Sequence, residues 1–323
     1  MNSKLDYYIN CFISLRRDYK NGGAPHKPIL LLSIIKLFEE EYFKSEHIYI
    51  TPNFISVFKI IWSKLVVSNH HAVFAMPYYH MKSEPFWKIF ANVGFKQLVE
   101  SKSLMRTLNN LLVAVKFATI DSELVQLLKN YTEREILKST ILDYYFPETK
   151  ANYKFLDKED LPNLSILSHS TKEYQETIKL LKKKLREDEF QEEVFIRCSI
   201  FKREIPKLYN NMCAISGMRI ITENDNSMID ACHIVPFAEG YNDSLTNGIA
   251  LCPNLHRAFD RGLISISDNY KILMSKYFIE SDSAYKLSTF SDKLIILPIN
   301  DKYYPDPENL FHHRKRFGFS NKL

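Results

Sequence analysis

The stretch that decides the fold lies in the C-terminal half of the chain and reads IDACHIVP at residues 229–236 and TNGIALCPNLHRAFDRG at residues 246–262. From Cys213 to about Ile266 the pattern predicts short strands and turns with one helical segment at residues 254–260. His233 stands at the end of an apolar segment, Asn247 precedes a glycine, and His256 lies in the helical segment. The order and context of these three polar residues point to a site with chemistry rather than to unrelated core positions.

This arrangement resembles the HNH nucleases, whose ββα-metal fold places a His at the end of a first strand, an Asn in the following loop and a His on a helix. His233, Asn247 and His256 occupy those positions in order. The resemblance implies phosphodiester hydrolysis, in which His233 is the general base that deprotonates water. Asn247 would hold the loop through backbone hydrogen bonds, and His256 would bind one divalent cation, Mg²⁺ or Mn²⁺.

The carboxylate that completes the metal site has three candidates. Many HNH sequences carry Asp or His directly before the first motif histidine, where this chain has Cys232. Asp230 ranks first, because a branch of HNH restriction enzymes has an acidic residue three positions before that histidine. Asp243 in the loop and Asp260, one helical turn after His256, are the alternatives.

The cysteines predict neither a disulfide framework nor a structural zinc site. There are five, an odd number, in a long chain that lacks an evident secretory signal. A family zinc site held by two C-x-x-C pairs cannot be built, because Cys213 and Cys252 each lack the second cysteine. Both are expected to be small buried apolar residues.

A second resemblance covers roughly residues 10 to 100 and rests on APHKPILLL at residues 24–32 and MPYYHMKSEPFW at residues 76–87. These segments look like a domain found ahead of HNH modules in bacterial restriction enzymes. They are similar to the sulfur-binding domains of nucleases that restrict phosphorothioate-modified DNA. The resemblance implies that Pro77 belongs to an apolar pocket and that His26 and Lys27 form a basic pair before a long helix.

Two neighbours of the proline depart from the sulfur-binding pattern, namely Met76 and His80. They predict a bulkier and more polar rim, so the domain could instead read another modification or an ordinary sequence through base edges. The residues expected to contact DNA are His26, Lys27, Pro77, Tyr78, His80, Lys82, Arg257 and Arg261. The alternatives are a core position for the aromatic residues, a structural role for His26 and Lys27 at the helix start, and salt bridges from the two arginines to Asp260 or Glu239.

Composition bounds the class of protein. The chain has 323 residues, of which 46% are hydrophobic and 25% charged, which is typical of a globular protein of about two domains. The longest nearly apolar run, residues 28–38, is shorter than the roughly 18 residues of a membrane span, so a soluble protein is expected. No secretory signal is visible, so a cytoplasmic location is expected. A net charge of +5 is weak evidence for nucleic acid. None of the eight glycines falls in a phosphate-binding loop, so no nucleotide cofactor is expected.

The chain as a whole is predicted to be α+β, with three parts. A mainly helical DNA-recognition domain is expected at residues 1–165, a charged helical connector at residues 166–190, and the ββα-metal nuclease domain at residues 191–323. Helices are predicted within the first part at residues 28–38, 52–65, 103–116 and 122–128, with a hairpin or strand pair at residues 78–90. Residues 307–317 predict a basic helix that docks on the nuclease core.

The sequence thus predicts a metal-dependent HNH endonuclease of a bacterial restriction system that cuts double-stranded, modified DNA. Its products would be a 5′-phosphate and a 3′-hydroxyl. A homodimer is expected, because one HNH centre cuts one strand. The alternatives are a sequence-specific restriction enzyme acting on unmodified DNA, a DNA-binding protein with a decayed nuclease, and a nuclease for RNA or structured DNA.

Overall fold

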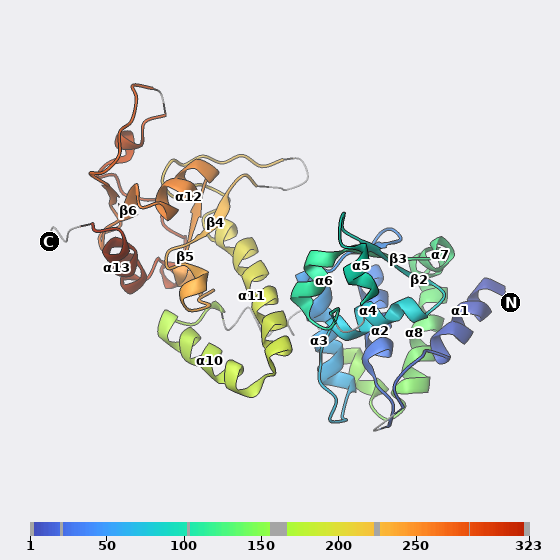
Figure 1. The fold of residues 1–323 in the computed structure, drawn as a ribbon. Helices are drawn as coiled ribbons and strands as arrows, with labels where there is room; N and C mark the ends of the chain where they lie inside the picture. Colours follow the sequence, from blue (N-terminus) through green and yellow to red (C-terminus); the bar gives the residue numbers. More distant parts are fainter. Residues whose placement is uncertain are drawn as a thin grey trace. The chain divides into compact units, whose positions relative to one another are not determined.

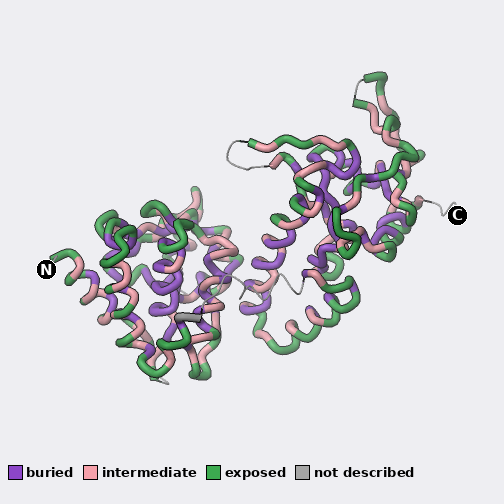
Figure 2. The backbone as a smooth tube through the Cα atoms, turned by 180° about the vertical axis from the view of Figure 1, so that it is seen from behind, coloured by how far each residue is buried: buried purple, intermediate pink, exposed green. Residues whose placement is uncertain are grey.

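The protein divides into two compact units. The computed structural model describes residues 3–19, 22–101, 104–155, 167–222, 227–283 and 285–319. Unit 1 comprises Met1–Leu161 and Leu185–Ile196, and unit 2 comprises Pro162–Lys184 and Arg197–Leu323. The segment 166–190, predicted as one connector, is therefore shared between the units. In each unit the inner segments are buried and the outer loops exposed (Figure 2).

Unit 1 is mainly helical and is built around α2, which buries eleven of its 14 residues. This confirms the buried helix that the apolar run after Pro28 predicted. The helix α3 begins at Pro52, and the Thr51 hydroxyl caps it by accepting a hydrogen bond from the Phe54 amide at 3.2 Å. The helices of unit 1 are α1 (Ser3–Ile13), α2 (His26–Glu39), α3 (Pro52–Leu65), α4 (Ala75–His80), α5 (Lys96–Glu100), α6 (Leu108–Ala114), α7 (Ser122–Lys129) and α8 (Tyr131–Tyr145).

A small antiparallel sheet completes unit 1, with β3 (Val115–Ile120) between β1 (His47–Ile48) and β2 (Trp87–Ala91). The hairpin predicted at residues 78–90 is wrong, because its first residues form α4 and β2 pairs with the distant β3. The Glu192 carboxylate accepts hydrogen bonds from the amides of Phe74 and Ala75, at 2.8 and 3.3 Å, and so favours a helix start there. The helix predicted at residues 103–116 is shorter, since β3 begins at Val115.

The described part of unit 2 contains two hairpins, each packed with a helix (Figure 1). The first pairs β4 (Asp230–His233) with β5 (Gly248–Leu251) and is followed by α12 (Pro253–Asp260). The second pairs β6 (Ile264–Ile266) with β7 (Ile272–Met274). The basic C-terminal helix α13 (Pro307–Arg316) docks on β6, where Arg314 donates a hydrogen bond to the Ile266 carbonyl at 2.8 Å. The α+β class and the ββα unit are as the sequence predicted.

Two further helices contribute to unit 2. The helix α10 (Thr171–Lys184) buries Tyr174 and Ile178, and Thr171 accepts a hydrogen bond from the Asn309 side chain at 3.0 Å. It is therefore a packed part of unit 2 rather than an exposed connector. The helix α11 (Glu187–Leu208) contains the unit boundary, and its residues from Arg197 onward belong to unit 2.

The end of α11 lies directly against the first hairpin. A side chain at Gly248 would meet the Ile205 side chain at 2.1 Å and the Phe201 ring at 3.0 Å. Only glycine permits this close approach of helix and strand. Among the described residues, no helix has the length and apolar character that crossing a membrane requires.

Candidate functional site

The first hairpin and α12 bring the three motif residues of unit 2 together. His233 ends β4 and pairs with Gly248 at the start of β5, and Asn247 immediately precedes that glycine. His256 lies on α12, which begins just after β5 with Pro253 in its first turn. The short strand–strand–helix connection is what concentrates these residues in one place.

Asn247 fastens the loop between the two strands. Its side chain is fully buried. The side-chain Oδ1 of Asn247 accepts a hydrogen bond from the Val235 backbone amide at 2.9 Å. The side-chain Nδ2 donates to the backbone carbonyls of Val235 and Asn242, at 3.0 and 2.9 Å. Because one side chain holds both ends of the loop, it fixes the path of the chain that leaves His233.

His233 is held on two sides. Its ring stacks on Phe201 of α11, with the centroids 4.0 Å apart and the planes 9° apart. Its Nε2 lies 2.9 Å from Oδ1 of Asp243, whose side chain is only 1% exposed. When Nε2 carries the proton and donates it to this carboxylate, Nδ1 is the ring nitrogen left to accept a proton.

Asp243 is therefore the hydrogen-bond partner of His233. Burial raises the pKa of the Asp243 carboxyl, and the hydrogen bond and charge of His233 oppose that shift, with a further lowering contribution from the charge of Arg197. This buried Arg197 belongs to α11. Among the described residues, the group that could hold a metal ion does not include Asp243, whose Oδ1 contacts His233 instead.

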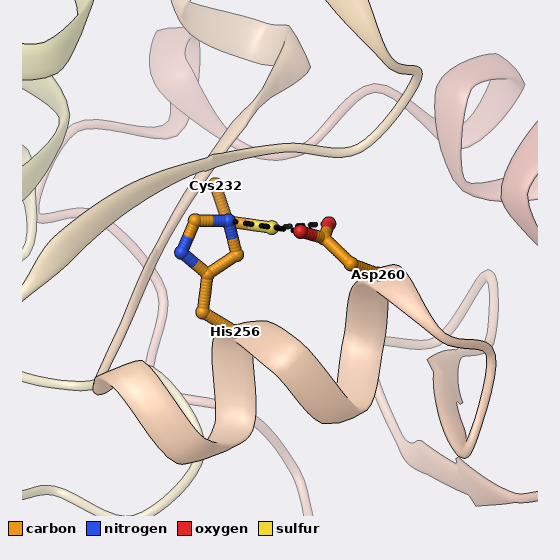
Figure 3. Close-up of side chains that lie close together, drawn as sticks. All are labelled: Cys232, His256 and Asp260. Atoms are coloured by element: carbon orange, nitrogen blue, oxygen red, sulfur yellow. Dashed lines mark hydrogen bonds and ion pairs between the residues drawn. The ribbon is translucent and has the colours of Figure 1, made fainter.

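A group suited to a metal ion forms beside α12 from Cys232, His256 and Asp260 (Figure 3). One ligand atom from each residue lies within 4.8 Å of the others. His256 Nε2 is 3.4 Å from the Asp260 carboxylate, and the Cys232 thiol is 3.8 Å from the same carboxylate. His256 and Asp260 are four residues apart and share one face of α12, while Cys232 reaches them from β4.

The donor set fits a divalent cation. An imidazole, a carboxylate and a thiol are all common ligands of such ions. Burial raises the pKa of the Cys232 thiol well above its usual value, with the charges of Asp260 and Asp230 adding to the shift. A bound cation acts in the opposite direction, because coordination favours the thiolate.

Asp230, the carboxylate ranked first from sequence, lies at the side of this group. Its Oδ2 is 3.3 Å from His256 Nδ1, and its side chain is 50% exposed. It contacts the ring nitrogen opposite to the one that faces Asp260. Asp260, and not Asp230, is the carboxylate that faces both His256 and Cys232. Asp230 as a metal ligand stays a prediction.

In unit 1, several residues expected to contact DNA are buried. The Lys27 ammonium is paired with the Glu84 carboxylate and donates a hydrogen bond to the Ser83 hydroxyl at 2.7 Å. Tyr78 is fully buried and donates to the Ile48 carbonyl at 2.8 Å, and Pro77 is buried beside it. The polar groups of Lys27 and Tyr78 are used inside the unit and Pro77 is buried, which argues against the direct DNA contact expected of these three residues.

The remaining unit 1 candidates lie nearer the surface. His26 packs against Trp62 and its Nε2 is 2.9 Å from the His71 carbonyl oxygen. Burial lowers the pKa of His26 to about 4. Lys82 is exposed, and its ammonium lies 3.9 Å from the centroid of the Tyr79 ring. His80 is half-buried at the end of α4.

Arg257 and Arg261 are exposed at α12. Within the described part of the chain neither forms an ion pair. The acidic residues considered as their partners are engaged elsewhere, since Glu239 pairs with Arg316 and Asp260 with His256. Both arginines therefore remain available for a phosphate.

Sequence reasoning missed two groups at this site. It treated Cys232 only as a departure from the usual pattern, although the cysteine stands where related sequences carry a metal ligand. It also did not connect Phe201 and Asp243 with His233. Phe201 carries no local signal, because it lies on a helix far from the motif in sequence.

Comparison with known proteins agrees with the geometry of the hairpin and α12. The HNH endonuclease family matches residues 213–267. No curated protein matches the chain. A solved structure, the modification dependent TagI restriction endonuclease, is 21% identical with a TM-score of 0.28. That match covers 36% of this chain and 37% of the other. Residues 213–267 thus match the HNH endonuclease family, whose members hydrolyse phosphodiester bonds.

Proposed function

We propose that the protein is a metal-dependent DNA endonuclease of a bacterial restriction system, and that it acts on modified DNA. The observation that carries the nuclease chemistry is the pairing of His233 with the buried Asp243. His233 directly follows Cys232, which faces His256 and Asp260. A histidine with one nitrogen committed to a carboxylate is oriented to accept a proton at the other.

His233 acts as the general base in this proposal. Its Nδ1 accepts the proton of a water molecule whose oxygen attacks the phosphorus atom. The bond between phosphorus and O3′ breaks, and the departing oxygen takes a proton from solvent. The products are a 5′-phosphate and a 3′-hydroxyl. Asn247 keeps the base in place by fixing the loop that follows it.

Cys232, His256 and Asp260 would hold the divalent cation. When bound, it supplies positive charge that stabilises the developing charge on the leaving oxygen. The sulfur ligand favours Zn²⁺ or Co²⁺ over the Mg²⁺ or Mn²⁺ expected from sequence, because thiolates prefer softer ions. Titration with Co²⁺ would test this directly, since a thiolate ligand produces a charge-transfer absorption that Cys232→Ser would remove.

Unit 1 reads the DNA modification in this proposal. The resemblance of residues 24–32 and 76–87 to sulfur-binding domains supports this role. Burial of Pro77 and Tyr78 leaves His80, Lys82 and His26 as the nearer contacts for DNA. A double-strand cut would require two HNH centres, so we propose a homodimer.

The test is cleavage of matched plasmids that are unmodified, cytosine-modified or phosphorothioate-modified, each with Mg²⁺, Mn²⁺ and Zn²⁺. Wild type is compared with His233→Ala and with His312→Ala, whose histidine is exposed on α13 and serves as the control. We expect cleavage of one modified plasmid only, its loss in His233→Ala and its retention in His312→Ala.

Other outcomes select among the alternatives. Cleavage of every plasmid alike would favour an enzyme for unmodified DNA and remove the modification-reading role of unit 1. Binding without cleavage under any metal would favour a decayed nuclease. Cleavage that survives in His233→Ala would disprove the proposed general base.

A further inference from the structure

The small sheet of unit 1 carries a group of aromatic rings on its outer side. We call it the aromatic sheet face, and it consists of His47, Tyr49, Phe90 and Phe117. The Phe117 ring lies at the centre, 4.6 Å from His47, 5.6 Å from Tyr49 and 5.1 Å from Phe90 between centroids. Tyr49 is 48% exposed and Phe90 is 44% exposed. The rings thus form a continuous cluster that reaches solvent.

Strand register explains why these rings share one face. Phe90 of β2 pairs directly with Phe117 of β3, and directly paired residues of antiparallel strands point to the same side. Two residues along β3, Thr119 pairs with both His47 and Lys88. Because side chains alternate along a strand, the side chains paired at Phe117 and those paired at Thr119 lie on the same side of the sheet.

The other side of the sheet is the one that unit 1 needs for its core. Ile48, Trp87, Ala118 and Ile120 are buried there, and Trp87 contacts Tyr78 of α4 at 5.3 Å between ring centroids. The sheet is therefore already anchored through one side. A cluster of exposed rings on the opposite side marks a binding surface more often than scattered single residues do.

The charge of the aromatic sheet face is positive. Lys88 is exposed on the same side. Lys116 lies at an irregularity of the β2–β3 pairing, where it has no partner on β2, and its ammonium is 5.8 Å from the centroid of the Phe117 ring. The three strands, which the structure describes completely, contain no acidic residue. The aromatic rings can stack on flat rings of a ligand, and the lysines can pair with negative charges that link those rings. Unpaired nucleic acid bases on their phosphate backbone have this chemistry.

We propose that the aromatic sheet face binds unpaired bases of DNA by stacking, with Lys88 and Lys116 contacting the adjoining phosphates. The inference rests on the proposed function only for the choice of DNA over RNA. It places base contact on β1, β2 and β3 rather than at the buried Pro77 and Tyr78. Unpaired bases are required, because the faces of paired bases in a duplex are already stacked on one another.

The experiment measures binding of a fluorescein-labelled oligothymidylate of about 15 nucleotides, a length that suits such surfaces. The full chain is used with EDTA, so that cleavage cannot contribute. We expect Tyr49→Ala and Phe90→Ala each to weaken binding about tenfold, the usual effect of removing one stacking ring. Tyr131→Ala is the matched control, because this tyrosine of α8 is 70% exposed and lies outside the aromatic sheet face. It should bind as wild type does.

A second variant reports stacking directly. Phe90→Trp preserves a flat ring, so it should keep the wild-type affinity, and its added fluorescence should be quenched when the oligonucleotide binds. Lys88→Ala should lower the slope of log affinity against log salt by about 0.7, the value for one phosphate contact on a single strand.

Several results would overturn the proposal. The first is wild-type affinity for the oligonucleotide in both Tyr49→Ala and Phe90→Ala. The second is a loss of affinity in Tyr131→Ala as large as in those two variants. The third is that Tyr49→Ala and Phe90→Ala lose as much affinity for a fully paired duplex as for the oligonucleotide. A change of oligomeric state by light scattering, without a change in DNA binding, would instead identify the face as a contact between copies of this chain. Failure of the nuclease assay with intact oligonucleotide binding would reject the proposed function and leave this inference standing.

Discussion

Two histidines of unit 2 are surrounded by carboxylates in opposite ways. His233 meets one carboxylate, that of Asp243, which is almost completely buried. His256 lies between Asp230 and Asp260, whose side chains are about half exposed. His233 also stacks on an aromatic ring, whereas His256 has a thiol close to its second carboxylate.

The difference separates two tasks that a hydrolase must perform. A buried carboxylate with a stacked ring fixes the orientation of an imidazole and commits one of its nitrogens. Several anionic donors around an imidazole, open to solvent, create a place for a cation. The proposed function thus divides proton transfer and metal binding between neighbouring but distinct groups, and variants should separate them.

The largest expected effect is a split between cleavage and metal binding. His233→Ala should reduce the cleavage rate by about 10² to 10⁴-fold, the usual contribution of a general base, and leave metal affinity unchanged. His256→Ala should abolish both. Plasmid nicking rates and calorimetric Zn²⁺ titration measure the two quantities. Loss of metal binding in His233→Ala would erase the distinction between the two histidines.

The next effect concerns the residue that orients the base. Asp243→Asn should lower the cleavage rate by about 10- to 100-fold, because an amide can stabilise the wrong tautomer of His233. Metal affinity and thermal stability should stay close to wild type, which the same titration and a melting curve would show. A drop in metal affinity would mean that Asp243 belongs to the metal group after all.

A third histidine tests what stacking does without a carboxylate. The His313 ring stacks on Phe259 with 3.7 Å between centroids, and its nitrogens contact the Ser265 hydroxyl and the Phe259 carbonyl. Burial lowers the pKa of His313 to about 4. The unfolded chain binds a proton below about pH 6.5 and the folded chain does not, so stability present above that pH is lost as the pH falls.

Between pH 7 and pH 5 this group should lower the free energy of unfolding by about 2 kcal/mol. Urea unfolding at both pH values measures the change. His313→Gln should reduce the difference between the two pH values, even if it lowers stability at both. An unaltered pH dependence in that variant would show that His313 is protonated alike in both states.

The smallest expected effect distinguishes the two carboxylates beside His256. Asp230→Asn should weaken metal binding by less than about fivefold, in line with an exposed ion pair. Asp260→Asn should weaken it by more, because this carboxylate faces both the imidazole and the thiol. Calorimetry on the pair of variants gives the order, and the reverse order would restore the ranking inferred from sequence.

Sequence alone predicted the nuclease region better than unit 1. The ββα unit needs only local pairing, and its ligands stand close to one another along the chain, so motif spacing carries the geometry. Cys232 shows the limit, since its role depends on which side chains α12 places opposite β4. Phe201 could not be found, because packing of α11 on the hairpin leaves no local pattern in the sequence.

In unit 1 the helices were largely predictable and the surface was not. The apolar run after Pro28 gave α2, but the pattern around Tyr78 suits a strand as well as a helix until Glu192 caps α4 from far along the chain. Lys27 illustrates the same problem for function. A basic residue at a helix start looks available to DNA, and only the structure reveals its pairing with Glu84.

The close approach of α11 to Gly248 also bears on how activity is coupled to folding. The family match begins at residue 213, yet Phe201, on which the His233 ring stacks, lies before that residue. The hairpin can pair its strands locally, but its histidine is supported only once the helix has docked. A chain cut immediately before residue 213 would keep every motif residue and lose the support of Phe201. The proposed nuclease activity therefore needs more of the chain than residues 213–267.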